Sequence, residues 1–293
     1  MVVAIIGLLV SILLPSLSSA RKQAVASVCL SNLRTFGAGM AGYMTTNRDV
    51  LVPGRLPKVD NCNTWADIAG GRKFRPTFAA MMSGEVGAPP FEDPLACKTD
   101  IDRFEEVGDR QNYSYAAYVC PEVPDWTDER NGSYGYNYQF LGNSRLSDPA
   151  NLQSWKNWPV RATTIRHPGR TVAAADCMGT AASQPPGSRG EYENNSRDPT
   201  LFGNEGFNLD PPWVDPAGGE MAILDGGSPA RTAADPRHRG GANVLWLDGH
   251  ADRRTLEILG YRFDADGAIG FQGENSKWTG SGDDLPWTSD TQP

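Results

Sequence analysis

The strongest hydrophobic pattern of the chain lies at its N-terminus, where residues 1–14 read MVVAIIGLLVSILL. A hydrocarbon core is spanned by roughly 20 apolar residues, so this run is too short for a complete span as it stands. Behind it, apolar residues recur at mostly three- and four-residue steps as far as Tyr43, which is typical of a helix. The pattern predicts one long helix over residues 1–46, bent near Pro15, whose first part lies in a membrane.

The rest of the chain predicts a loop-rich head with short strands. Residues 75–82 indicate a short helix, and residues 171–175 read as a buried strand that ends at Asp176. The expected fold class is α+β: the long N-terminal helix carries a globular head, residues 47–272, which contains a small antiparallel sheet.

The clearest strand signal lies near the end of this head. Residues 242–247 form an apolar run, Asp248-Gly249 is suited to a two-residue turn, and residues 250–253 would return as the partner strand. The sequence therefore predicts a hairpin within residues 238–253.

Two regions are expected to lie outside the compact core. Residues 179–236 are rich in Pro, Gly, Asn and Asp and hold few apolar side chains, which favours a long surface excursion that carries specificity or an ordered but inert insertion. Residues 273–293 form a polar tail, expected to be disordered, that contains Trp278 and Trp287.

Composition and charge are consistent with an exported protein. The formal charge of −8 argues against nucleic acid as a partner, because binding phosphates takes clustered cations. The early cations Arg21, Lys22 and Arg34 lie on the helix instead. Cationic residues beside an apolar helix favour the cytoplasmic side, and would by themselves direct the head inward.

The five cysteines allow two interpretations. In an exported protein, Cys62, Cys97, Cys120 and Cys177 could form up to two disulfides with three connectivities, whereas Cys29 would stay free on the helix. Alternatively, all five are buried thiols. The sequence has no Cys-x-x-Cys pair, which argues against a zinc cluster.

Metal and catalytic candidates are few. His238 and Asp248 could meet only if Gly240-Gly241 bends the chain back, and His250 would then add a ligand. Asp264 and Asp266 offer oxygens that suit calcium, although a hairpin turn explains them equally well. No H-E-x-x-H motif, phosphate loop or G-x-S-x-G elbow occurs, so we expect neither an enzyme nor a resident cofactor.

Several segments, in order along the chain, resemble the prepilin-like proteins of bacterial pilus and type II secretion systems. The N-terminal helix, with a proline after its apolar run and the segment Cys29-x-x-Asn32-Leu33, is similar to the methylated helix of that family. His238 and Asp248-Gly249 enclose nine residues, as in the H-x9-DG signature of a prepilin-type, processing-associated domain. Three segments show weaker similarity to the family: Cys120-Pro121, SYGYNYQFLG from residue 133 and HPGRTVAAAD from residue 167.

The resemblance implies a pilin-like or pseudopilin-like subunit, anchored once in the cytoplasmic membrane, with its head outside the cytoplasm. Its partners would be the bilayer, related subunits in a filament or pseudopilus, and a prepilin peptidase. The family's phenylalanine, glutamate and basic leader are missing, so the resemblance implies that Met1 falls inside the helix and that either the native start lies upstream, where a prepilin peptidase would act, or the leader has been lost. The helix positions expected to support assembly are Gly7, Leu8, Leu9, Leu13, Leu14, Pro15, Leu17, Ala20, Ala24, Val28, Leu33 and Phe36.

Two other classes of function remain open. In the first, residues 1–20 are a signal peptide cleaved after Ser18-Ser19-Ala20, and the mature chain is an exported binding protein or adhesin that recognises a glycan or polymer. Tryptophans would supply its stacking surfaces: Trp126, Trp155, Trp158 and Trp213. The second is an enzyme acting on a polymer, which would depend on His238.

Overall fold

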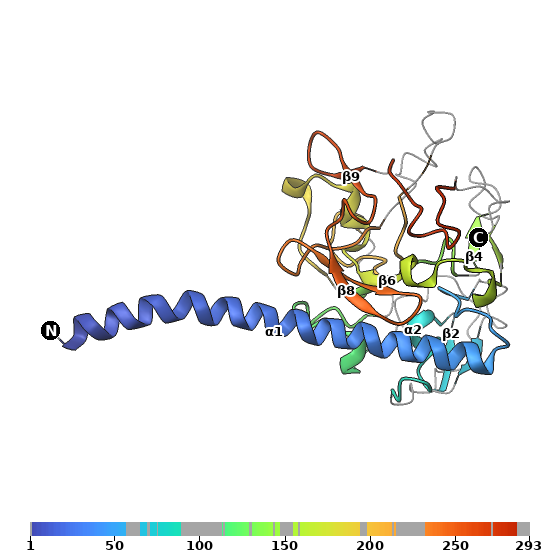
Figure 1. Ribbon diagram of the computed structural model, residues 1–293, viewed down its shortest axis with the longest axis horizontal. Coiled ribbons are helices and arrows are strands. Elements are labelled where there is room, and N and C mark those ends of the chain that lie inside the picture. The colour runs from blue at the N-terminus through green and yellow to red at the C-terminus, as the bar shows by residue number, and fades with distance from the viewer. Residues whose placement is uncertain are drawn as a thin grey trace.

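In a computed structural model, the described part of the chain combines one long helix with one globular head (Figure 1). The described residues are 2–56, 65–68, 71–74, 76–88, 113, 115–128, 131–142, 144–146, 155–157, 159–193, 198–212, 214, 232–270 and 272–285. The long helix and the small antiparallel sheet of the head confirm the expected α+β class.

Helix α1, Val2–Thr46, is continuous through Pro15 and projects away from the head over its first half (Figure 1). We call residues 2–24 its protruding half and residues 25–46 its packed half. The apolar side chains buried in the packed half follow helical spacing: Ala26, Cys29, Leu33, Phe36 and Met40.

Two of the positions expected to support assembly are accessible. Val28 is 49% exposed, because the head contacts the face that carries Cys29 and Leu33, and Leu17 is 69% exposed in the protruding half. Conversely, Leu33 and Phe36 are buried inside the head, so these two expected assembly positions are not available to a neighbouring subunit.

The head is centred on a four-stranded antiparallel sheet with the strand order β3-β6-β7-β8. Its strands are β3 Tyr134–Tyr136, β6 Val172–Asp176, β7 Ala242–Trp246 and β8 Ala251–Arg254. Both β6 and the β7–β8 hairpin were predicted from their apolar runs, and the structure confirms them.

The hairpin turn itself is longer than predicted. Trp246 N–H donates to His250 C=O, so the loop is the three residues between them. Gly249 alone in this loop has a positive φ, 91°, which fits a three-residue loop that ends in a left-handed glycine.

The remaining elements are short. One is the helix α2, Phe78–Met81. Three antiparallel strand pairs lie outside the main sheet: β1 Trp65–Ile68 with β2 Gly71–Phe74, β4 Ser144–Leu146 with β5 Trp155–Asn157, and β9 Arg262–Phe263 with β10 Ile269–Gly270. The 3₁₀ turns are η2 Ala116–Tyr118, η3 Ala162–Thr164, η4 Pro168–Arg170, η5 Gly179–Ser183 and η6 Pro186–Ser188.

The sheet separates two apolar cores, because successive side chains of a strand point to opposite faces. Leu245 belongs to the core shared with α1, where Phe36 lies within 5.5–5.7 Å, between ring centroids, of Phe78, Tyr118 and Tyr134. Val244 belongs to the second core, on the other face of the sheet.

The second core contradicts two expectations about loops. Trp278 is fully buried and its Nε1–H donates to Leu259 C=O, so the expected polar tail is part of the head as far as residue 285. Within the region expected to be a surface excursion, Leu209 is fully buried and Phe207 nearly so. Trp287 and residues 215–231 lie outside the described residues.

Candidate functional site

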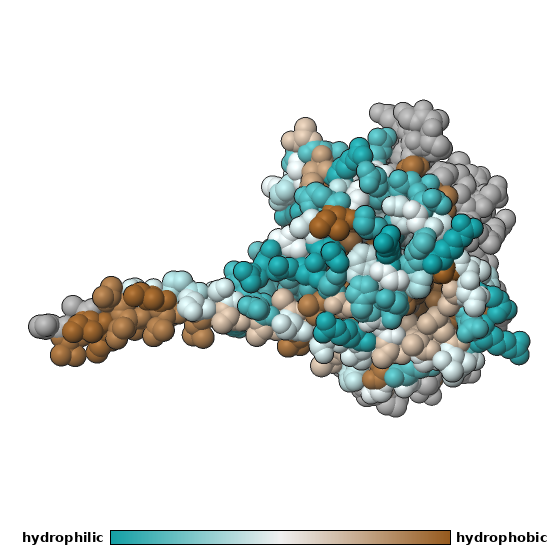
Figure 2. Space-filling view, viewed as in Figure 1, coloured by the Kyte–Doolittle hydropathy of each residue, from teal (hydrophilic) through white to brown (hydrophobic). Residues whose placement is uncertain are grey.

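The protruding half of α1 carries an apolar surface that the head does not cover. Figure 2 shows this surface at the far end of the helix, where Leu9 is 55% exposed and Leu13 is 63% exposed. In the described part of the chain, α1 is the one helix long and apolar enough to cross a membrane, and a signal sequence would share these properties.

The packed half of α1 lies against the head at very short range. A Cβ atom built on Gly37 would lie 3.0 Å from Leu245 Cδ1 and 3.1 Å from Gly249 Cα. One built on Gly39 would lie 2.6 Å from Val86 Cγ1. The distal glycines of α1 therefore permit close approach to the hairpin and to the segment after α2.

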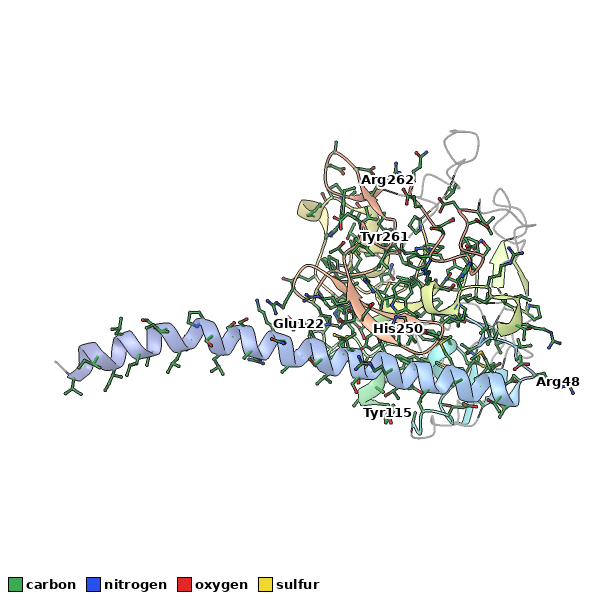
Figure 3. The ribbon with its side chains drawn as sticks, in the orientation of Figure 1. Arg48, Tyr115, Glu122, His250, Tyr261 and Arg262 are labelled. Carbon is green, nitrogen blue, oxygen red and sulfur yellow. The ribbon has the colours of Figure 1, made fainter. Side chains whose placement is uncertain are left out.

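The H-x9-DG segment runs alongside α1, and its two ends lie beside different turns of the helix. His238 lies near Cys29, whereas Gly249 contacts Gly37 two turns further along. In the view of Figure 3, Glu122 and His250 are seen one after the other along the direction of α1, with Glu122 nearer to the protruding half.

Four side chains from distant parts of the chain meet where α1 enters the head: Cys29, Cys120, Asp176 and His238. We call them the buried cluster, because their exposed fractions are 0–2%. One ligand-type atom from each lies within 4.8 Å of all the others. Among the described residues, this is the only such group of three or more His, Cys, Asp or Glu side chains.

The individual contacts within the buried cluster are short. Cys29 Sγ lies 3.0 Å from Asp176 Oδ1, and Cys120 Sγ lies 3.3 Å from His238 Nε2. His238 Nε2 is in turn 3.5 Å from Asp176 Oδ2.

Backbone geometry positions three of these side chains. Asp176 ends β6, and its Oδ2 accepts a 2.7 Å hydrogen bond from Asn243 N–H on the adjacent strand. Cys120 N–H donates to Ser133 Oγ. His238 exchanges two backbone hydrogen bonds with Gly241 in a tight turn that precedes β7.

Asn32 and Tyr134 connect the fourth side chain, Cys29, to the same region. The Asn32 side-chain amide donates to the carbonyl oxygens of Ala116 and Val119, directly before Cys120. It also donates to Tyr134 Oη, whose hydroxyl donates to Cys29 Sγ at 3.2 Å. Asn32 thus ties α1 to the segment that presents Cys120.

The cluster also shifts the ionisation of its members. Hydrogen bonding to Cys29, reinforced by His238 and Arg237, lowers the pKa of Cys120 to about 4 despite burial. Burial raises the pKa of Asp176 to about 6. Cys177, outside the cluster, has a pKa raised by burial to about 12. Of the three cysteines that the structure describes, Cys120 is therefore the one most easily ionised, and the thiolate is the form of cysteine that binds metals.

The predicted disulfides are not formed by the cysteines that the structure describes. Cys29, Cys120 and Cys177 are all free and buried, which contradicts the disulfide interpretation for Cys120 and Cys177 and agrees with the alternative of buried thiols. Cys62 and Cys97 lie outside the described residues.

Sequence reasoning missed the cluster because it sought neighbouring ligands in Cys-x-x-Cys spacing. The available signal was different: Cys29, Cys120, Asp176 and His238 each lie in one of four separate segments that had been singled out as motifs. The fold brings these segments to one point.

The His238–Asp248 pair considered from the sequence does not form. The turn at Gly240-Gly241 exists, but His238 faces Cys120, and Asp248 lies beyond the opposite end of β7. Asp248 instead contacts His250 at the exposed turn, with 2.5 Å between Oδ1 and Nδ1.

The other candidates have structural roles. Asp264 and Asp266 lie at the β9–β10 turn, where Asp266 Oδ1 accepts from Ala268 N–H, as the hairpin alternative predicted. Trp126 is 7% exposed and stacks on Tyr192, so it offers little surface to a glycan. Trp158 and Trp213, and the side chain of Trp155, lie outside what the structure describes.

Comparison of the chain with protein-family models, with curated proteins and with solved structures finds no match.

Proposed function

We propose that this protein is a membrane-anchored structural subunit that assembles with like or related subunits through the protruding half of α1, in the manner of pilins and pseudopilins. The observation that carries the proposal is the contrast within this one helix. Its protruding half is apolar and uncovered, whereas its packed half is part of the core of the head.

The dimensions of α1 suit this role. The uncharged residues 2–20 extend about 28 Å at 1.5 Å per residue, close to the ~30 Å thickness of a hydrocarbon core. Arg21 and Lys22 follow at once, and the buried stripe begins at Ala26. The head would therefore lie at the membrane surface, where its packing against α1 would hold the end of the membrane-embedded segment in place.

Assembly would replace lipid contacts by helix contacts. Small residues let helices approach closely in lipid, and several lie along the protruding half: Gly7, Ser11, Ser18, Ser19 and Ala20. Because Arg21 and Lys22 favour the cytoplasmic side, the proposal places the head outside only if a prepilin-type leader precedes the helix.

The segments that resemble prepilin-like proteins also support the proposal. Cys29, Asn32, Cys120 and His238 all belong to the contact between α1 and the head. A subunit that transmits force or position through a long helix needs its head fixed on that helix, and these residues serve that need.

Cysteine crosslinking in membranes tests the proposal. A thiol introduced by Ser11→Cys in the protruding half should give a crosslinked dimer in native membranes, because neighbouring helices would bring two such thiols together. Ser188→Cys, the same substitution at an exposed position of the head, is the matched control and should give little dimer. Equal crosslinking of both variants, or none of Ser11→Cys, would contradict assembly through the helix.

A soluble exported binding protein is the second candidate, and one observation favours it. The Ser18-Ser19-Ala20 segment is exposed and precedes the buried stripe, so cleavage after Ala20 would leave the helix–head contact intact. The mature N-terminus, mapped by terminal peptides from membrane and extracellular fractions, separates the two. A start at Arg21 favours the binding protein, whereas a methylated residue upstream of Met1 favours the pilin-like subunit.

A further inference from the structure

We propose that the buried cluster is a structural Zn²⁺ site, in which Cys29, Cys120, Asp176 and His238 hold one ion and thereby fix α1 to the head. The inference rests on the cluster alone and does not depend on whether the protruding half of α1 mediates assembly.

The spacing of the donor atoms fits a tetrahedral ion. Bonds of about 2.3 Å to sulfur and about 2.0–2.1 Å to nitrogen or oxygen set the ligand atoms about 3.3–3.8 Å apart. The recorded separations are 3.0 Å for Cys29 Sγ to Asp176 Oδ1, 3.3 Å for Cys120 Sγ to His238 Nε2, and 3.5 Å for His238 Nε2 to Asp176 Oδ2. All the ligand atoms lie within 4.8 Å of one another, so movements of at most about 1 Å would bring them to the separations of a tetrahedral zinc site.

The chemistry of the donors selects the metal. Two sulfurs, one imidazole and one carboxylate suit zinc, whereas calcium and magnesium prefer sites made only of oxygen. Four protein ligands complete a tetrahedron and leave no open position for water or substrate, which is the arrangement of structural rather than catalytic zinc. The nearly complete burial of all four side chains agrees with a closed site.

Neighbouring groups are placed to support bound zinc. Hydrogen bonds from Asn243 N–H to Asp176 and from the Tyr134 hydroxyl to Cys29 would orient those ligands. Two thiolates and a carboxylate exceed the charge of Zn²⁺ by one. The buried guanidinium of Arg237, which interacts electrostatically with Asp176 and Cys120, would offset part of that excess.

A third buried cysteine shows what a packing thiol looks like in the same head. Cys177 is also fully buried, but its thiol donates to the carbonyl oxygen of Asn208 and is not part of the cluster. Burial of a cysteine therefore does not by itself explain why the four side chains of the buried cluster lie together. A core that needed only apolar filling would not place two thiols, an imidazole and a carboxylate at one point, because buried polar groups are costly unless they are paired.

The location of the site gives it a function. Cys29 lies at the start of the packed half of α1, and the other three ligands come from the loop after η2, the end of β6 and the turn before β7. One ion would join four segments that are remote in sequence at the base of the protruding helix. Loss of the ion should loosen this junction first.

Zinc content of the full chain, purified in detergent and dialysed, tests the proposal. We expect one zinc per chain in the unsubstituted protein and a fall to background in Cys120→Ser. Cys177→Ser, the same substitution at the buried thiol outside the cluster, is the matched control and should keep its zinc. Chelation should lower the melting temperature of the unsubstituted protein, and added zinc should restore it.

A second measurement keeps the test decisive if Cys120→Ser fails to fold. The unsubstituted chain, stripped with chelator and loaded with Co²⁺, should show the strong visible bands of tetrahedral cobalt together with a thiolate-to-cobalt charge-transfer band. Unsubstituted protein without zinc and without these bands would overturn the proposal. So would peptide mapping of the native protein that finds a Cys29–Cys120 disulfide in place of two metal-binding thiols.

Discussion

The two halves of α1 share one continuous helical backbone but differ in what covers their side chains. In the protruding half, Leu9 and Leu13 are more than half exposed, whereas in the packed half Leu33 and Phe36 are buried. An isolated helix is only marginally stable in water, and most helices are stabilised by packing of an apolar face. The packed half obtains this stabilisation from the head, whereas the apolar side chains of the protruding half are left exposed.

The comparison also shows that glycines in the two halves of α1 have different surroundings. Gly7 in the protruding half has no atom within 4 Å of a built Cβ, whereas Gly37 in the packed half would place its Cβ against backbone atoms of Gly249. The same residue type thus leaves a surface open to partners in one half and permits close packing on the head in the other.

The largest difference between the halves is expected for apolar truncation. Phe36→Ala should lower the free energy of unfolding of the head by about 3–5 kcal/mol, as is usual for a buried aromatic side chain. Its ring contacts three other aromatic rings, which would be left around a cavity. Chemical denaturation of the full chain in detergent, followed by tryptophan fluorescence, measures this change.

Leu9→Ala is the matched truncation in the protruding half and should leave unfolding of the head unchanged, because Leu9 is 55% exposed and is not among the buried residues of the described core. If both variants lowered stability equally, the division of α1 into a packed and a protruding half would be wrong.

A smaller difference is expected when a glycine is enlarged. Gly37→Val should destabilise the head by about 1–3 kcal/mol, the usual cost of overpacking, because its side chain would meet Leu245 and the backbone of Gly249. Gly7→Val places the same side chain in open space and should be neutral in the same denaturation experiment. A neutral Gly37→Val would mean that the hairpin does not lie against α1 as described.

Local patterns predicted those parts of the fold that depend on neighbouring residues. Apolar runs located β6 and β7, and apolar spacing predicted a helix that ends at Thr46. The same spacing did not identify the buried face of that helix, because both Val28 and Cys29 are apolar enough to be buried. The choice between them depends on which side the head occupies, and that is set by tertiary contacts.

Polar composition was misleading for the loop regions. Asn204 is buried because its side chain donates to Thr180 Oγ1, and Asp210 is buried because it accepts hydrogen bonds from Thr232. Such partners lie 22–24 residues apart, so a local count of apolar residues underestimates the order of the segment. The buried cluster escaped prediction for the same reason, since its four members are remote in sequence.

The smallest effect is expected at the exposed turn that ends the hairpin, where the head meets α1 beside Gly37. Partial burial opposes ionisation of Asp248, but hydrogen bonds from His250 outweigh it and lower the pKa of this carboxyl. A carboxyl whose pKa is lower in the folded than in the unfolded state stabilises the fold above its unfolded pKa, near 4. That contribution is lost as the pH falls through the lower, folded pKa.

Asp248→Asn should therefore remove about 0.2–1 kcal/mol at neutral pH, because the Asp248–His250 pair is exposed to solvent and screened. The difference from the unsubstituted protein should shrink as the pH falls below the unfolded pKa of the carboxyl, since the native Asp248 is then protonated as well. Denaturation curves at a series of pH values measure it, with Asp49→Asn at an exposed position after α1 as the control. A difference that persisted unchanged into strong acid would assign the role of Asp248 to the shape of the turn, which asparagine alters, and not to its charge.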